Sequence, residues 1–148
     1  MNRIFLGCIF TALSCISGSA CAGDKVLHLD VKDVLDTGFA GGKLDGSVKF
    51  YLTGQSTPKI LKKMEEDVTN KKTNGVGKSN VESCKWAMLS ALIAFQESAK
   101  ARGANAVVGI SSYYRKVEYK SASQYECHVG NIMSGVALKG SYAKLAGK

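Results

Sequence analysis

The strongest periodic pattern in the chain runs from Ser79 to Gly103, where apolar residues recur every three or four positions. This spacing places them on one side of an α-helix. Ser79 and Glu82 have the separation of a capping box, and Gly103 can adopt the left-handed conformation that ends a helix. We therefore predict one long helix over about 80–102, with an apolar stripe made of Val81, Cys84, Met88, Leu92, Phe95 and Ala99.

A second apolar stripe, made of Trp86, Leu89 and Ile93, lies beside the first on the predicted helix. An apolar face this wide needs cover from more than one neighbouring element. Large apolar patches that stay exposed commonly mark sites of protein contact. Trp86, Leu89 and Ile93 are therefore the candidate interface residues, provided that the sheet covers only the first stripe.

Other segments of the chain alternate between apolar and polar residues, which is the period of a half-buried strand. Gly130 and Gly135 fall inside the last of these segments, where glycine is typical of a bulge or a close backbone approach. The pattern as a whole predicts an α+β fold in which the long helix packs on a small mixed β-sheet. The predicted strands are 26–35, 47–52, 104–114 and 125–138, with a further strand near 60–64 or 67–69, a hairpin over 113–120 and a short tail over 141–148.

The first residues have the pattern of an export signal. Arg3 precedes a short apolar run, and small residues follow it up to Ala22. We predict that residues 1–22 are a signal peptide and that 23–148 form a single domain. The apolar run is too short to span a membrane, so the mature protein is expected to be periplasmic or secreted.

Cys21 leaves an alternative open for the same segment. It follows Gly18-Ser19-Ala20, a sequence similar to a bacterial lipobox. Acylation of Cys21 would anchor the protein to a membrane as a lipoprotein. Contact with a membrane is expected only in that case.

Cleavage of the leader would leave two cysteines, Cys84 and Cys127, in an oxidising compartment where disulfides persist. Short connections would make the helix and the strands after it antiparallel in turn. Cys84, in the first turns of the helix, and Cys127, near the start of the last strand, would then lie at one end of the fold. We predict a Cys84–Cys127 disulfide, which would stabilise the domain by about 4 kcal/mol on the chain-entropy estimate.

Charge and motifs argue against several functions. The net charge of +8 could suggest nucleic acid, but the lysines are scattered and acidic residues lie beside them. Gly77-Lys78-Ser79 ends like a phosphate-binding loop, yet Lys72 stands where that motif needs glycine. Neither His28 nor His128 has a recognisable nucleophile nearby. We therefore expect no enzymatic activity, no cofactor, no nucleotide and no nucleic acid.

Two stretches, 103–110 and 135–138, resemble the YbjQ-like family, small proteins often labelled heavy-metal-binding. The cysteine on the last strand is similar to one in the envelope-stress lipoprotein RcsF, which shares that fold. The segments 69–74 and 126–128 look like a group of small exported bacterial proteins commonly mislabelled as an excinuclease ATPase subunit. The resemblance covers roughly 49–140 and implies a helix packed on a small mixed sheet.

These observations favour a non-enzymatic, exported protein of the bacterial envelope, stabilised by its disulfide. It would serve as a protein-interaction or stress-related module and bind an envelope protein or a second copy of itself. The alternative is a periplasmic heavy-metal-binding or redox-sensing protein that uses Cys84, Cys127 and His128. Because adjacent residues of a strand point to opposite faces, Cys127 and His128 are poorly placed to share an ion.

Overall fold

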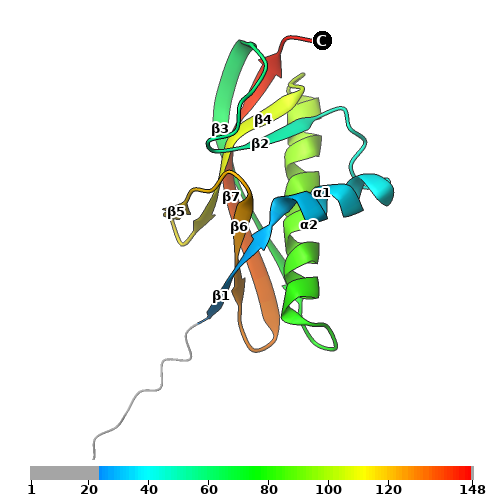
Figure 1. Ribbon diagram of the computed structural model, residues 1–148, viewed down its shortest axis with the longest axis vertical. Coiled ribbons are helices and arrows are strands. Elements are labelled where there is room, and N and C mark those ends of the chain that lie inside the picture. The colour runs from blue at the N-terminus through cyan, green and yellow to red at the C-terminus, as the bar shows by residue number, and fades with distance from the viewer. Residues whose placement is uncertain (1–23, 148) are drawn as a thin grey trace, which may run out of the picture.

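The computed structural model describes residues 24–147. The predicted signal peptide and the alternative acylation at Cys21 therefore lie outside the described residues. The described part of the chain contains two helices, one after the first strand and one after the third, and the remaining strands follow the second helix (Figure 1). The elements are β1 (Lys25–Asp30), α1 (Val31–Ala40), β2 (Lys49–Leu52), β3 (Ile60–Asn74), α2 (Asn80–Ala101), β4 (Ala106–Tyr114), β5 (Val117–Tyr119), β6 (Gln124–Val129) and β7 (Met133–Leu145).

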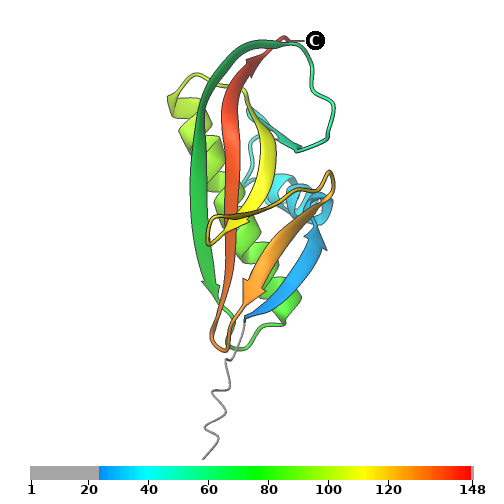
Figure 2. The same ribbon diagram turned by 90° about the vertical axis from the view of Figure 1, so that its left-hand side faces the viewer.

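The described strands form one curled, mixed sheet built around β7 (Figure 2). β3 pairs antiparallel with β7 along one side. On the other side, β6 pairs with the beginning of β7 and β4 with its later part. β1 continues the sheet beyond β6, and β2 continues it beyond β4 as a parallel neighbour. The fold is thus α+β with a mixed sheet, as the sequence predicted.

α2 confirms the predicted long helix. The Ser79 hydroxyl oxygen accepts a hydrogen bond from the backbone N–H of Glu82 at 3.1 Å, which caps the first turn. Gly103, with φ of +68°, follows the last turn. The helix packs across one face of the sheet and supplies much of the core, including the fully buried Met88, Leu92 and Phe95.

α1 corrects the prediction of a single helix and of a strand over 26–35. The strand ends at Asp30, whose carboxylate accepts a hydrogen bond from the backbone N–H of Lys32 at 2.8 Å. This N-cap starts a helix in which Val31 and Val34 are buried. The apolar alternation reached Val31, but the side-chain cap at Asp30 changes the backbone from extended to helical.

The C-terminal prediction also needs correction. The segment 125–138 is two strands, with Gly130 in the turn that joins them. Much of the predicted tail, as far as Leu145, is the end of β7. Gly140, not Gly135, is the tight contact in this strand, because a Cβ atom at Gly140 would lie 2.9 Å from Val107 Cγ1.

Candidate functional site

The predicted disulfide is present. Cys84 of α2 is bonded to Cys127 of β6, with the Cα atoms 5.9 Å apart and both side chains fully buried. One step of the topology behind this prediction is wrong. β4 and β6 are both antiparallel to β7 and therefore run in the same direction. Cys127 reaches α2 because β6 lies beside the first part of β7, not because its strand reverses the direction of β4.

The three alternative metal ligands, Cys84, Cys127 and His128, do not form a common site. Both sulfur atoms are used in the bond, and His128 lies on the opposite face of the sheet from Cys127. The His128 Nε2 atom lies 2.6 Å from Glu126 Oε1. Within residues 24–147, no group of three or more histidine, cysteine, aspartate or glutamate side chains has a geometry that could hold a metal ion.

A histidine pair on the outer face of the sheet is a feature that the sequence did not reveal. His28 of β1 lies opposite Glu126 of β6, so both histidines approach the same carboxylate, His28 at 3.4 Å. The His128 ring stacks on Tyr114 with the ring centres 3.5 Å apart, and the His28 ring lies 4.4 Å from Tyr119. His28 and Glu126 are 98 residues apart in sequence, so only the Glu126–His128 spacing could have suggested the cluster.

A cavity of about 340 Å³ adjoins this cluster at the turn between β6 and β7. The one hydroxyl in its lining is that of Tyr114, which donates a hydrogen bond to Asp24 at 2.9 Å and is not directed at the His128–Glu126 pair. The cluster joins β1 to β6 through contacts of both histidines with Glu126. The lining residues are Asp24, Lys72, Tyr114, His128, Gly130, Asn131, Ile132, Met133 and Gly135.

The candidate interface is reduced to one large side chain. α1 packs beside the second apolar stripe and covers Leu89, which is 5% exposed. Gly38 of α1 permits this approach, because a Cβ atom there would lie 2.9 Å from Leu89 Cδ1. Ile93 is half-buried, whereas Trp86 remains 48% exposed. The prediction is therefore wrong for Leu89 as an exposed contact, and Trp86 is the exposed member of the stripe.

Trp86 borders a groove of about 180 Å³ between α1 and α2, which we call the Trp86 groove. Its accessible surface is almost entirely apolar. Lys85 on its rim forms an ion pair with Asp33, with Nζ and Oδ2 3.3 Å apart. The groove is therefore an apolar depression with a charged rim, lined by Val34, Thr37, Glu82, Lys85, Trp86 and Leu89.

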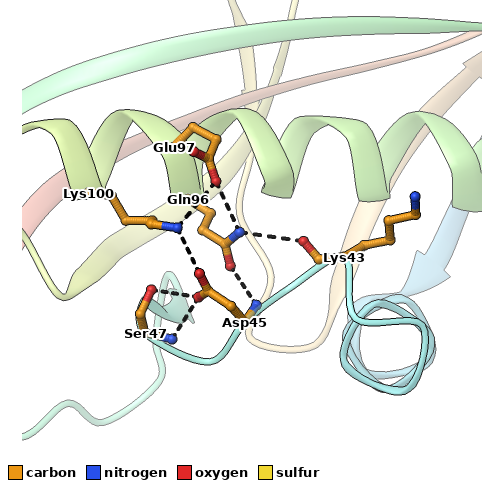
Figure 3. Close-up of polar contacts among 6 residues, drawn as sticks. All are labelled: Lys43, Asp45, Ser47, Gln96, Glu97 and Lys100. Atoms are coloured by element: carbon orange, nitrogen blue, oxygen red, sulfur yellow. Dashed lines mark hydrogen bonds and ion pairs between the residues drawn. The ribbon is translucent and has the colours of Figure 1, made fainter.

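A polar network holds the loop after α1 against α2 (Figure 3). Gln96, only 3% exposed, accepts a hydrogen bond from the backbone N–H of Asp45 at 3.0 Å and donates one to the Lys43 carbonyl at 3.4 Å. The Lys100 ammonium lies 2.8 Å from the Asp45 carboxylate. This hydrogen bond, with others from Ser47, holds the pKa of Asp45 well below its ordinary value. The network fixes the C-terminal connection of α1 against α2.

Comparison with known proteins adds no family assignment. No protein-family model matches the chain, and no curated protein is significantly similar to it. Neither helix in residues 24–147 combines the length and hydropathy that crossing a bilayer requires.

Proposed function

We propose that this protein is an exported, non-enzymatic protein-interaction module of the bacterial envelope and that it binds its partner through the Trp86 groove. The observation that carries this proposal is a tryptophan left 48% exposed beside an apolar groove between two packed helices. Tryptophan is enriched among the residues that dominate binding energy in protein interfaces. A half-exposed tryptophan beside a preformed groove therefore favours recognition of another protein.

The chemistry of the groove indicates what the partner supplies. An apolar side chain of the partner would fill the space between Trp86 and Val34 and release water from both. Polar groups of the partner would face Glu82 and Lys85 on the rim and would contribute mainly to orientation. The partner surface is thus an apolar anchor with charged or polar residues around it.

Two features support the export part of this proposal, and both are consistent with a location outside the cytoplasm. The leader-like sequence over residues 1–22 predicts passage out of the cytoplasm. The Cys84–Cys127 bond is compatible with the oxidising compartment to which such a leader directs a protein. The lipoprotein form, anchored through Cys21, would place the same groove at a membrane surface.

Binding can be tested with Trp86→Ala and a matched control, Val117→Ala. Val117 is an exposed apolar residue on β5, away from the groove. Proteins captured from envelope extracts by the wild type would be identified, and the affinity of the purified partner would be measured for each variant. We expect Trp86→Ala to weaken binding by about 30-fold, which corresponds to roughly 2 kcal/mol, and Val117→Ala to leave it unchanged. An unchanged affinity for Trp86→Ala would contradict the proposal.

The metal-binding or redox-sensing alternative makes a different prediction. It requires free thiols at Cys84 and Cys127, because a disulfide sulfur is a poor metal ligand. Intact mass before and after reduction, together with metal analysis of the purified protein, distinguishes the interaction module from the metal-binding or redox-sensing alternative. A stoichiometric metal with both thiols free would favour the alternative over the module.

A further inference from the structure

The long strand β3 is an edge of the sheet. It spans 15 residues, and within the described structure β7 is its only paired neighbour. Figure 2 shows β3 (green) as the outermost strand beside β7 (red). From Glu66 to Asn74 its pairing with β7 has no bulge, so this part presents a regular outer edge. Such an edge is a template for an additional strand.

The backbone of this edge has a donor directed away from β7. The N–H of Val68 donates to the carboxylate of Asp67, its own neighbour in sequence, at 2.8 Å. The Asp67 side chain thus covers a donor that a further strand could use. The same carboxylate accepts a hydrogen bond from the Tyr142 hydroxyl at 2.6 Å, which keeps Asp67 at this position.

The charges of β3 form a pattern that is complementary to itself. Acidic residues at Glu66 and Asp67 are followed by Lys71 and Lys72, on either side of Thr69. Burial alternates along this part, so Glu66 and Lys72 lie on the outer face of the sheet, whereas Asp67 and Lys71 lie on the α2 side. Each face therefore carries one acidic and one basic residue at equal distances from Thr69.

We propose that β3 pairs with β3 of a second copy of this chain, antiparallel and about a two-fold axis at Thr69. In this register Glu66 lies opposite Lys72 of the second copy, and Asp67 lies opposite Lys71 of the second copy. Symmetry repeats both pairs. Opposite charges that face each other across two strands stabilise the pairing. The Val68 N–H then donates to a backbone carbonyl of the second copy, which takes the place of Asp67.

Other registers are less favourable. A two-fold axis that continues the sheet must pass through a residue, because the outer face of one copy has to meet the outer face of the other. An axis at Asp67 would place Lys62 and Lys63 opposite Lys72 and Lys71 of the second copy, and like charges in these positions are destabilising. An axis at Val68 would form only the Glu65–Lys71 pair, in the irregular part of β3 where Glu65 already pairs with Arg102. An axis at Asn70 would form no ion pair. Charged edge residues discourage indiscriminate pairing, and here they also select one register.

The register can be tested by exchanging charges. The molar mass of the purified oxidised protein would be measured by light scattering and analytical ultracentrifugation over a range of concentrations. We expect the wild type to dimerise. Glu66→Lys and Lys72→Glu should each raise the dissociation constant by about tenfold or more, because each places like charges opposite each other. The double variant E66K/K72E should restore the wild-type constant to within about threefold, because it exchanges the pairs without removing them.

Two further variants distinguish pairing through the β3 edge from a general effect of charge or of misfolding on dimerisation. Lys116→Glu makes the same charge change as Lys72→Glu but in the hairpin between β4 and β5, and it should leave dimerisation unchanged. Val68→Pro removes the outward N–H without removing a β3–β7 hydrogen bond and should abolish the dimer, while circular dichroism shows an intact fold. A wild type that stays monomeric up to millimolar concentration, or a double variant that fails to restore pairing, would overturn the proposal.

Discussion

The two ends of α2 are fixed to the rest of the molecule in different ways. Near its N-terminus, the Cys84–Cys127 bond joins the helix covalently to β6. Toward its C-terminus, the helix is held by polar side chains. Gln96 binds the loop that leads to β2, and Arg102 forms an ion pair with Glu65 of β3. The covalent anchor depends on an oxidant, whereas the ion pairs of the polar anchor depend on pH. One helix thus combines two anchors that respond to different conditions.

The largest effect should come from removing the covalent anchor. The double variant Cys84→Ala/Cys127→Ala opens a loop with a sequence separation of 43 residues. We expect the free energy of unfolding, measured by urea denaturation, to fall by about 4 kcal/mol because the unfolded chain gains conformational freedom. Wild-type protein under reducing conditions should show a similar loss. A loss below about 1 kcal/mol would mean that the polar contacts alone hold α2 on the sheet.

Removing the central residue of the polar anchor should have the next largest effect. Gln96→Ala leaves the N–H of Asp45 and the carbonyl of Lys43 without their partner, and we expect a loss of about 2 kcal/mol in the free energy of unfolding. The exposed neighbour Glu97 is the control, and Glu97→Ala should change stability by less than about 0.5 kcal/mol.

Gln96 and Cys84 lie about 18 Å apart along the helix, so their effects should add if the two anchors are independent. This can be measured by combining Gln96→Ala with the double cysteine variant. A combined loss well below the sum of the separate losses would show that one anchor acts through the other.

Two buried tyrosines allow a matched comparison of the two ends. The Tyr142 hydroxyl donates to Asp67, whereas the Tyr125 hydroxyl, on β6, has no hydrogen-bond partner among the described residues. Burial raises the pKa of both, that of Tyr142 to about 12. Tyr142→Phe should therefore cost about 1 kcal/mol, and Tyr125→Phe should be neutral or stabilise by up to about 1 kcal/mol, measured by thermal unfolding. Equal losses in both variants would contradict this difference.

The smallest effect should be the pH dependence of the polar anchor. The hydrogen bond from Lys100 keeps the pKa of Asp45 below its ordinary value of 3.8, so the folded state favours the ionised carboxylate. Its contribution is complete above pH 3.8 and is lost as the pH falls further, toward the lowered pKa of the folded state. Asp45→Asn should therefore be less stable than the wild type at pH 7, and the difference should shrink below pH 3.8. A difference that grows toward low pH would contradict this assignment.

Local signals in the sequence predict the structure correctly where each signal acts within a few residues. Ser79 and Gly103 mark the ends of α2, since a cap and a left-handed turn depend only on neighbouring backbone groups. α1 was missed for a related reason. The alternation of Leu27 and Leu29 extends through Val31, but the N-cap at Asp30 overrides it and starts a helix.

The candidate site was less predictable, because it depends on which elements of the fold cover each apolar residue of α2. The pattern identified Trp86, Leu89 and Ile93 as one stripe, but the packing of α1 decides which of them is exposed. The approach of His28 to Glu126 likewise depends on the pairing of β1 with β6. Periodicity gives the direction of a side chain on its own element, and it does not give the neighbour.

The sequence by itself determined the α+β class, the extent of the long helix and the partners in the disulfide. Helix caps, hydrophobic periods and a single remaining pair of cysteines are properties of short stretches or of counting. Only the tertiary structure decided that β3 is an edge, that β6 and β4 share one side of β7, and that Trp86 alone of its stripe stays largely exposed. These features arise from contacts between residues distant in sequence, whose energies depend on which surfaces meet when the whole chain folds.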